Sequence, residues 1–334
     1  MPSIRAVAAG LAVALAVVAA LAAGAPASAQ QLARIDRPTP MSAYGSGLLW
    51  SQRDAGGAFR LMYAEEGRAP APLPGVAPRS VPFDADLGSA GDGPFLAVYS
   101  RCATEPPYDP QQPFVDWRRA RGCRLYEYDL TRGRERSLES DGVLPAVWKG
   151  SFAYFSEGRR PTLLLRGRRG GPARTLPGGP TGRRFDLPTS IDLYGRRLAV
   201  AWRFSGRLDA PGSEILLVDT RRRTKRVVDR IGGGGLTSIT REAPAFDSGR
   251  LYWARLCQGD PGGCPGRAAL VRYRYAASGP AQTAPIGRYD LWQARGGGVT
   301  WLLRDDSPFR LCREVGRPTP AATCRIFGSS TRYR

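Results

Sequence analysis

"RGCRLYEYDLTRGRER", residues 121–136, reads as a strand that starts at Cys123, alternates polar and apolar residues, and runs into a glycine turn. Alternation over this length predicts a half-buried β-strand, and the glycine predicts the turn that ends it. The stretch therefore indicates a strand and the start of a hairpin. The stretch can predict the whole fold only if the same arrangement occurs elsewhere in the chain.

A related pattern does recur along the chain at intervals of 48 to 55 residues. Each copy has a glycine turn followed by two mostly apolar residues and an aromatic residue, which is typical of the second strand of an antiparallel unit. The chain contains no sustained helical period, and its 41 Gly and 29 Pro suit many short strands. The aromatic positions are Trp50, Tyr99, Tyr154, Trp202, Trp253 and Trp301.

Each aromatic strand is followed by an apolar anchor for a third strand, and several third strands lead through a polar turn into a fourth. Four strands in about 50 residues is the size of a propeller blade. The sequence therefore predicts an all-β, six-bladed β-propeller of four-stranded antiparallel blades. A β-sandwich is the alternative, because sandwiches space their strands similarly. The third-strand anchors are Leu61, Leu125, Leu163, Ile215, Leu270 and Ile326.

The two ends of the repeat array indicate how the ring closes. Only seven residues follow Phe327, which is too few for a turn and a full outer strand. We expect Leu32–Asp36 to complete the blade that ends at Phe327, which would leave no open edge in the ring.

The six cysteines fall into three local pairs, each placed to join the second and third strands of one hairpin. The pairs are Cys102 with Cys123, Cys257 with Cys264, and Cys312 with Cys324. Metal binding is the alternative use of clustered cysteines, but the chain has no CxxC pair and no histidine. We expect three disulfides and no metal or other cofactor.

The repeated glycine turn, the apolar and aromatic strand and the "ILLVD" strand resemble the TolB-like, WD-repeat-like propellers of secreted bacterial proteins. The stretches "VYSRC" and "GCRLYEYDLTRGRER" are similar to uncharacterised propellers of high-GC actinobacteria. The resemblance covers nearly all of residues 30–330 and implies a fold that binds partners or, in some families, is joined to a hydrolase. These motifs are structural, so the resemblance implies no catalytic residue.

The first 29 residues resemble a secretory signal peptide. Arg5 precedes a long uncharged run that ends in the triplet Ala27-Ser28-Ala29, which predicts cleavage before Gln30. A retained membrane anchor is the alternative. The sequence thus predicts one propeller domain over residues 30–334 that is monomeric and secreted or associated with the cell envelope, with no transmembrane segment after cleavage.

The formal charge of +20 comes almost wholly from arginine. For an exported protein, anionic envelope polymers are the natural partners of such a charge, and nucleic acid is not expected. A solvated surface and codon bias are the alternative explanations. The densest basic run predicts contacts to an anionic partner at Arg221, Arg222, Arg223, Lys225 and Arg226.

The absence of histidine removes Ser-His-Asp triads, Cys-His pairs and His-bound metal sites. Asp84, Asp86 and Asp92 have a spacing that loosely suggests calcium, but no acidic residue closes the loop as in an EF-hand; the alternative is that they shape a turn.

The sequence favours a non-catalytic extracytoplasmic propeller that binds a protein, a peptide or an anionic envelope component. The alternative is a carboxylate-dependent glycan hydrolase or lyase, which would need a carboxylate pair in the propeller funnel.

Overall fold

The fold consists almost entirely of β-strands. The computed structural model describes residues 30–35, 39–65, 68–91, 95–108, 115–167, 171–178, 186–205, 211–231, 238–247, 250–258, 268–274, 282–287, 290–296, 299–304 and 309–314. These ranges contain β1 to β24 and one short 3-10 helix, η1 (Trp117–Arg119). Within them no helix is long and apolar enough to cross a membrane. The predicted all-β class is confirmed.

The described strands form six four-stranded antiparallel sheets. In each sheet the strands pair in the following order. The first sheet contains β2 (Met41–Tyr44), β3 (Gly47–Arg53), β4 (Phe59–Ala64) and β5 (Ala71–Pro72), and the second contains β6 (Asp86–Ser89), β7 (Phe95–Thr104), β8 (Arg121–Asp129) and β9 (Arg134–Asp141). The third contains β10 (Val143–Trp148), β11 (Ser151–Phe155), β12 (Leu163–Arg166) and β13 (Arg174–Thr175), and the fourth contains β14 (Leu187–Tyr194), β15 (Arg197–Ser205), β16 (Pro211–Asp219) and β17 (Thr224–Ile231). The fifth contains β18 (Ser238–Asp247), β19 (Arg250–Gln258), β20 (Ala268–Arg274) and β21 (Gln282–Gly287), and the sixth contains β22 (Asp290–Gly296), β23 (Val299–Arg304), β24 (Phe309–Glu314) and β1 (Gln30–Ile35).

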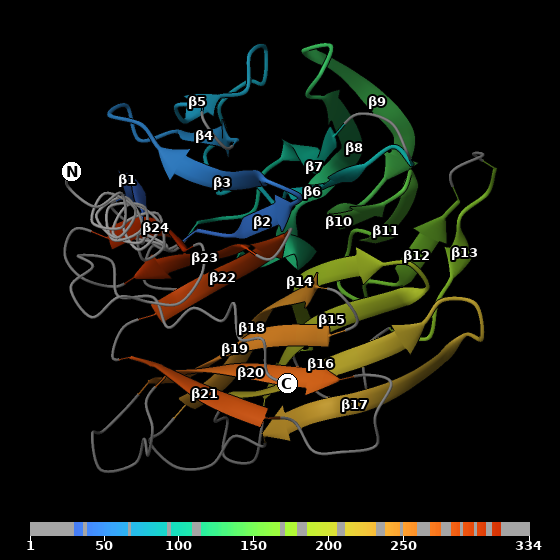
Figure 1. Ribbon diagram of the computed structural model, residues 1–334. Coiled ribbons are helices and arrows are strands. Elements are labelled where there is room, and N and C mark those ends of the chain that lie inside the picture. The colour runs from blue at the N-terminus through green and yellow to red at the C-terminus, as the bar shows by residue number, and fades with distance from the viewer. Residues whose placement is uncertain are drawn as a thin grey trace, which may run out of the picture.

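The sheets adopt a β-propeller arrangement (Figure 1). Their first strands lie innermost and contact one another in the order β2, β6, β10, β14, β18 and β22, and β22 contacts β2. The side chains are described most fully in the four sheets from β2 to β17. The predicted propeller of four-stranded antiparallel sheets is thereby supported by strand pairing and by contacts between sheets.

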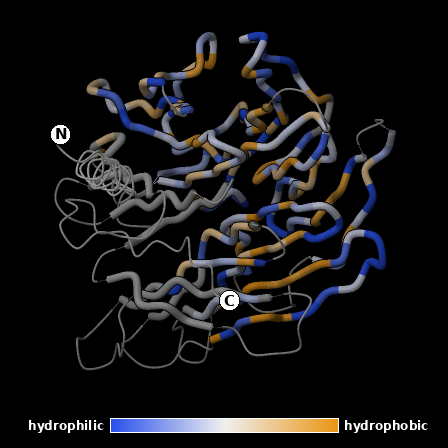
Figure 2. The backbone as a smooth tube through the Cα atoms, viewed as in Figure 1, coloured by the Kyte–Doolittle hydropathy of each residue, from blue (hydrophilic) through white to orange (hydrophobic). Residues whose placement is uncertain are grey.

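The recurring aromatic residue lies on the second strand of each sheet, as predicted. Four of these aromatics, Trp50, Tyr99, Trp202 and Trp253, belong to buried apolar clusters. Five of them, Trp50, Tyr99, Tyr154, Trp202 and Trp253, are buried, and Trp301 lies on β23. Figure 2 shows hydrophobic residues along the strands and hydrophilic residues along many of the turns at the periphery.

The third strands begin where the sequence predicts them in five of the six sheets. Leu61, Leu125, Leu163, Ile215 and Leu270 lie on β4, β8, β12, β16 and β20.

The prediction for the last sheet is wrong, because its third strand is β24 and not the segment at Ile326. The register pairs Trp301 with Arg313 and Leu303 with Leu311, so the hairpin closes across the short segment between β23 and β24. Ile326 and Phe327 lie outside the described residues.

The N-terminal strand pairs with the last sheet. β1 runs antiparallel to β24, with Ala33 opposite Leu311 and Ile35 opposite Phe309. Ile35 is buried in a small apolar cluster with Leu48 of the neighbouring sheet. The N-terminal strand thus completes the sheet, but its partner is β24 rather than the predicted strand at Phe327.

A disulfide joins the second and third strands of the β6–β9 sheet. Cys102 on β7 lies directly opposite Cys123 on β8, with Cα atoms 3.8 Å apart. Cys123 is buried and Cys102 is partly buried. The first of the three predicted disulfides is therefore confirmed. Cys264 and Cys324 lie outside the described residues, so the pairs Cys257–Cys264 and Cys312–Cys324 remain predictions.

Candidate anion-binding pocket

The chain enters β8 through η1, which directly precedes that strand. Asp116 caps this 3-10 turn, because its Oδ1 accepts a hydrogen bond from the Arg118 backbone N–H at 3.3 Å. Trp117 is buried within this turn, whereas Arg118 is partly exposed and Arg119 is largely exposed. An acidic cap followed by a buried tryptophan thus presents consecutive arginines to the surface.

Arg79 fixes the base of this segment from the connection that precedes β6. Its guanidinium donates to both carboxylate oxygens of Glu105, at 3.0 and 2.6 Å, and to the Ser100 backbone carbonyl at 2.8 Å. The same group lies 5.1 Å from the ring centre of Phe83 and 5.2 Å from that of Trp117. Paired and stacked in this way, the buried cation holds the segment against the sheet.

Glu157 links the segment to the β11–β12 loop of the next sheet. Its Oε2 accepts a hydrogen bond from the Cys123 backbone N–H at 2.9 Å. The loop itself is closed by Ser156 and Thr162: the Ser156 N–H donates to the Thr162 carbonyl, and the Thr162 N–H donates to Ser156 Oγ, each at 2.9 Å. The loop that carries Arg159 therefore has a defined position relative to β8.

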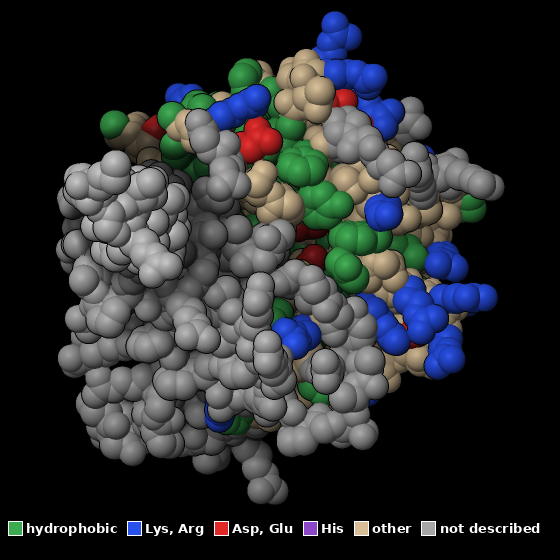
Figure 3. All heavy atoms as spheres, viewed as in Figure 1, with side chains coloured by type: hydrophobic (Ala, Val, Ile, Leu, Met, Phe, Trp, Pro, Cys, Tyr) green, Lys and Arg blue, Asp and Glu red, His purple; other side chains and the backbone are tan. Residues whose placement is uncertain are grey.

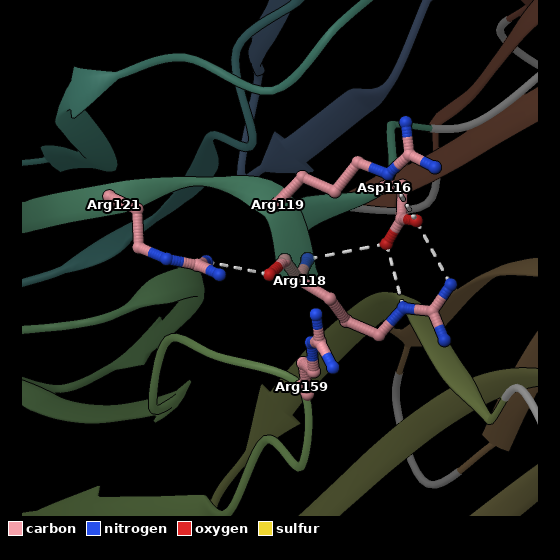
Figure 4. Close-up of a pocket in the computed structure, with 5 residues that line it drawn as sticks. All are labelled: Asp116, Arg118, Arg119, Arg121 and Arg159. Atoms are coloured by element: carbon pink, nitrogen blue, oxygen red, sulfur yellow. Dashed lines mark hydrogen bonds and ion pairs between the residues drawn. The ribbon is translucent and has the colours of Figure 1, made fainter.

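These two segments form a pocket of about 480 Å³ (Figure 4). It is lined by Asp116, Arg118, Arg119, Arg121 and Arg159. Asp116, Arg118 and Arg119 come from the segment between β7 and β8, Arg121 is the first residue of β8, and Arg159 comes from the β11–β12 loop. Four guanidinium groups and one carboxylate leave an excess of three positive charges in the pocket.

The carboxylate neutralises only part of this charge. Asp116 accepts from Arg118 Nε at 2.7 Å and from Arg118 Nη2 at 2.9 Å, and its Oδ2 lies 3.7 Å from Arg119 Nε. Arg121 donates to the backbone carbonyls of Arg118 and Ala120, at 2.8 and 2.6 Å, and pairs with no carboxylate among the described residues. Arg159 is exposed, and no acidic side chain among the described residues pairs with it.

The arrangement is suited to binding an anion. Guanidinium groups present forked donors that match carboxylate, phosphate and sulfate oxygens. Among the described lining residues, Asp116 is the only one that can accept a proton, and it is held in a two-point pair with Arg118. These residues therefore offer donors for a bound anion but no free proton acceptor.

The basic run predicted as a partner contact forms the turn between β16 and β17. Asp219 Oδ1 accepts from the backbone N–H groups of Arg221 and Arg222, each at 3.0 Å. Arg221, Arg222, Arg223, Lys225 and Arg226 are all exposed. Figure 3 shows Lys and Arg side chains spread along the outer edge of one face. The structure does not bring this turn to the pocket, and its role as a contact stays a prediction.

The aspartates considered for calcium have other roles. Asp84 accepts from the Ser100 N–H and Oγ and from the Leu144 N–H, at distances of 2.7 to 3.0 Å. Asp86 accepts from Ser42 Oγ and from the Val147 N–H. No group of acidic or cysteine side chains in the described ranges is arranged to hold a metal ion. Asp92 lies outside these ranges, and the two described aspartates connect neighbouring sheets.

Two inner-strand aspartates influence each other across the propeller. Burial, together with the charge of Asp192 on β14, raises the pKa of Asp86 to about 8. Burial also raises the pKa of Asp192 to about 6, although N–H groups of Phe246 and Leu193 oppose this shift. Figure 3 shows acidic side chains at the bottom of a hollow near the middle of the face, between hydrophobic side chains.

Sequence reasoning missed the arginine pocket. The signal that could have found it is the run "DWRRARGCR" at residues 116–124, where an acidic residue and three arginines precede a hairpin cysteine. Arg159 could not be added from the sequence, because it reaches the pocket from another sheet.

No family model matches the chain. No curated protein is significantly similar to it either. Among solved structures, one in the nidogen/laminin complex has 13% identity and a TM-score of 0.48, covering 78% of this chain and 86% of the other. A protein of unknown function from Dyadobacter fermentans has 12% identity and a TM-score of 0.48, covering 87% and 98%.

A puromycin-hydrolysing peptidase of Mycobacterium tuberculosis has 16% identity and a TM-score of 0.46, covering 86% of this chain and 42% of the peptidase. Each of these scores is below 0.5, so the similarities carry no argument about function. The resemblance to TolB-like and WD-repeat-like propellers stays a prediction.

Proposed function

We propose that the chain is a non-catalytic, extracytoplasmic binding propeller whose arginine pocket holds an anionic group of an envelope component. In this proposal residues 1–29 are removed on export, and residues 30–334 form one domain with the six sheets as blades of a ring closed by β1. The disulfide between Cys102 and Cys123 supports an oxidising compartment. The circuit of contacts among first strands supports a single ring.

The observation that carries the proposal is the convergence of arginines from two sheets on one pocket. Arg118, Arg119 and Arg121 lie beside a rigid 3-10 turn, and Arg159 arrives from the β11–β12 loop. Like charges gathered in a concave site repel each other, and a bound anion relieves this repulsion. A solvated surface alone does not require them to converge.

The pocket is expected to bind without catalysing a reaction. The chain has no histidine, and Asp116 is engaged with Arg118 and Arg119. Acid–base cleavage of a glycan needs a pair of carboxyl groups, and the described lining residues include one carboxylate alone. Binding should therefore be reversible and should weaken as salt screens the charges.

The test compares two variants that remove equal charge from different places. Arg121→Gln/Arg159→Gln alters the pocket, and Arg221→Gln/Arg222→Gln alters the exposed turn. Both are titrated against immobilised envelope fractions at low and high salt, with melting temperatures measured to check folding.

We expect the pocket variant to bind at least about tenfold more weakly, since it loses two charge-assisted contacts, and the turn variant to change less than about twofold. The reverse result would move the site to the turn. Capture that is insensitive to salt and to both variants would overturn the proposal.

A carboxylate-dependent glycan hydrolase or lyase is the second candidate. It is favoured by the raised pKa values of Asp86 and Asp192, because such separation of pKa values is typical of acid and base pairs. Asp86, however, is occupied by Ser42 and by a backbone N–H of the next sheet. Cleavage of a glycan with a bell-shaped pH profile between about 6 and about 8, lost in Asp192→Asn, would replace the binding proposal with this one.

A further inference from the structure

The arginine pocket already holds one carboxylate, that of Asp116. Both oxygens of this group face the Arg118 guanidinium, at 2.7 and 2.9 Å, in the two-point geometry that a carboxylate adopts with an arginine fork. Arg119 approaches the same carboxylate at 3.7 Å. Figure 4 shows this pair on one side of the pocket, with Arg121 and Arg159 on the other.

We propose that the ligand of this pocket is the carboxylate of a uronic-acid polymer, and that Asp116 is an internal competitor that yields Arg118 to it. The inference rests on the proposed function and narrows its ligand. One carboxylate takes the place of another on Arg118, so that the arginine keeps a partner throughout the exchange. Arg121 and Arg159 receive further oxygens of the polymer.

The exchange costs little because the internal pair is partly open to water. About a quarter of each side chain is exposed, at 22% for Arg118 and 24% for Asp116. Ion pairs with such access to solvent contribute on the order of 1 kcal/mol or less to stability. Arg118 also donates through Nη1 to the backbone carbonyl of Asp186, which precedes β14, at 3.5 Å, so this contact remains when Asp116 moves away.

The lining of the pocket favours a sugar acid over an acidic peptide. Protein partners usually insert an aromatic or aliphatic anchor into an apolar recess. All five described lining residues are charged, so the pocket offers no such recess. A hydroxyl-rich ring with one carboxylate requires only polar donors, and a volume of about 480 Å³ is within the range of small-ligand sites.

The test is calorimetric titration of the mature protein and Asp116→Asn with oligogalacturonate. Asparagine keeps an oxygen to cap the 3-10 turn but carries no charge. We expect Asp116→Asn to bind at least about fivefold more tightly, because the competing carboxylate is gone. Asp141→Asn is the matched control, since Asp141 is exposed, lies outside the pocket and contacts Arg124 at 3.8 Å. It should change binding less than about twofold.

Further ligands separate the possible failures. Methyl-esterified oligogalacturonate should bind at least about tenfold more weakly than the free acid. If polyphosphate or dextran sulfate binds as tightly as the uronate at equal charge, or if polyglutamate binds more tightly, the uronate assignment is wrong while the anion-binding function stands. If Asp116→Asn leaves the affinity unchanged, Asp116 is not a competitor. If no polyanion binds, the proposed function itself fails.

Discussion

The chain has two arginine-rich regions that are built in different ways. The pocket segment between β7 and β8 is closed by the Cys102–Cys123 disulfide, rests on buried Trp117 and shares Asp116 between two guanidiniums. The turn between β16 and β17 is held by its own backbone, by Asp219 and by a hydrogen bond from Arg223 to the Thr175 carbonyl of the neighbouring sheet, and its basic side chains are exposed. The turn has the higher density of positive charge in the sequence, but the pocket lies at the first region.

The difference shows that charge density alone does not identify a binding site. In the turn, the basic side chains are exposed and solvated at little cost, and Arg223 also donates to the Thr175 carbonyl at 3.2 Å. In the pocket, cations from separate sheets are brought together by groups that resist their repulsion. Substitutions that remove the contacts holding one region, and leave the other region intact, therefore test this comparison.

The disulfide should contribute the largest effect. Removing it in Cys102→Ala/Cys123→Ala frees a hairpin with a sequence separation of 21 residues, for which loop entropy predicts a loss of about 3 kcal/mol in the free energy of unfolding. Urea unfolding followed by fluorescence measures the loss. Anion binding should fall with it, since the pocket segment is no longer closed at its base.

The turn variant Arg221→Gln/Arg222→Gln serves as its control and should change the free energy of unfolding by less than about 0.5 kcal/mol. An unaltered urea midpoint in the cysteine variant would show that the pocket segment does not depend on the disulfide.

The link through Glu157 should have the next largest effect. Glu157→Ala leaves the Cys123 N–H without its acceptor beside a buried residue, which costs about 2 kcal/mol. Thermal unfolding measures this loss. Glu157→Gln retains an acceptor oxygen and should restore most of the stability. Equal melting temperatures for the alanine variant and the parent would remove Glu157 as the link between the two sheets.

Asp219, which caps the basic turn, should contribute less than Glu157 to the free energy of unfolding, and its contribution should depend on pH. Burial alone would raise the pKa of Asp219, but the N–H groups of Arg222 and Arg221 and the charges of Arg197 and Arg196 outweigh it and lower the pKa. A lowered pKa stabilises the fold above the unfolded value of about 3.9, and this contribution is lost as pH falls through the folded value.

Asp219→Ala should therefore cost about 1 kcal/mol at pH 7, and the difference from the parent should shrink below about pH 4. Urea unfolding at pH 7, 5 and 3 measures both. A difference that grows toward low pH would contradict this account of the turn.

The smallest effect is expected at Arg223, which has a φ of 57°. The corresponding turn between β8 and β9 has Gly133 with a φ of 63° at the same place, and in both turns the N–H donates to the carbonyl of the aspartate that starts the turn, at 2.8 Å. Left-handed backbone favours glycine. Arg223→Gly should raise the free energy of unfolding by about 0.5 kcal/mol. Gly133→Arg is the reciprocal change and should lower it; gains from both substitutions would show that the two turns are not equivalent.

Much of the fold could be predicted because each sheet repeats the same local pattern. The aromatic residue on every second strand and the pairing of Cys102 with Cys123 follow from hairpins, in which the interacting residues are close in sequence. The third strand of the last sheet was placed too late because Ile326 and Phe327 look like a strand on their own. Nothing in that local pattern shows that β24 had already closed the hairpin.

The pocket could not be predicted in full because its parts are distant in sequence. The run that contains Asp116 and Arg118 is visible in the sequence, but its convergence with Arg159 depends on the packing of two sheets. The sequence predicts partner contacts at the basic turn because five cations lie within six residues. Residues that are adjacent along a turn do not, however, gather their side chains around a pocket. The predicted contacts thus follow from the density of positive charge along the sequence, whereas the pocket depends on tertiary structure.

The pairing of β1 with β24 has a consequence for how the molecule is made. Gln30 lies opposite Arg313, so the first strand to be synthesised finds its partner only after nearly all of the other strands have been produced. Until then β1 and the first sheet lack their neighbour, and the exposed strand edge can pair with another chain. Folding must therefore finish with a long-range step that joins the two ends of the array. Closure of such distant contacts is slow, and the β1–β24 pairing should set the time at which the chain first becomes resistant to proteases and to aggregation.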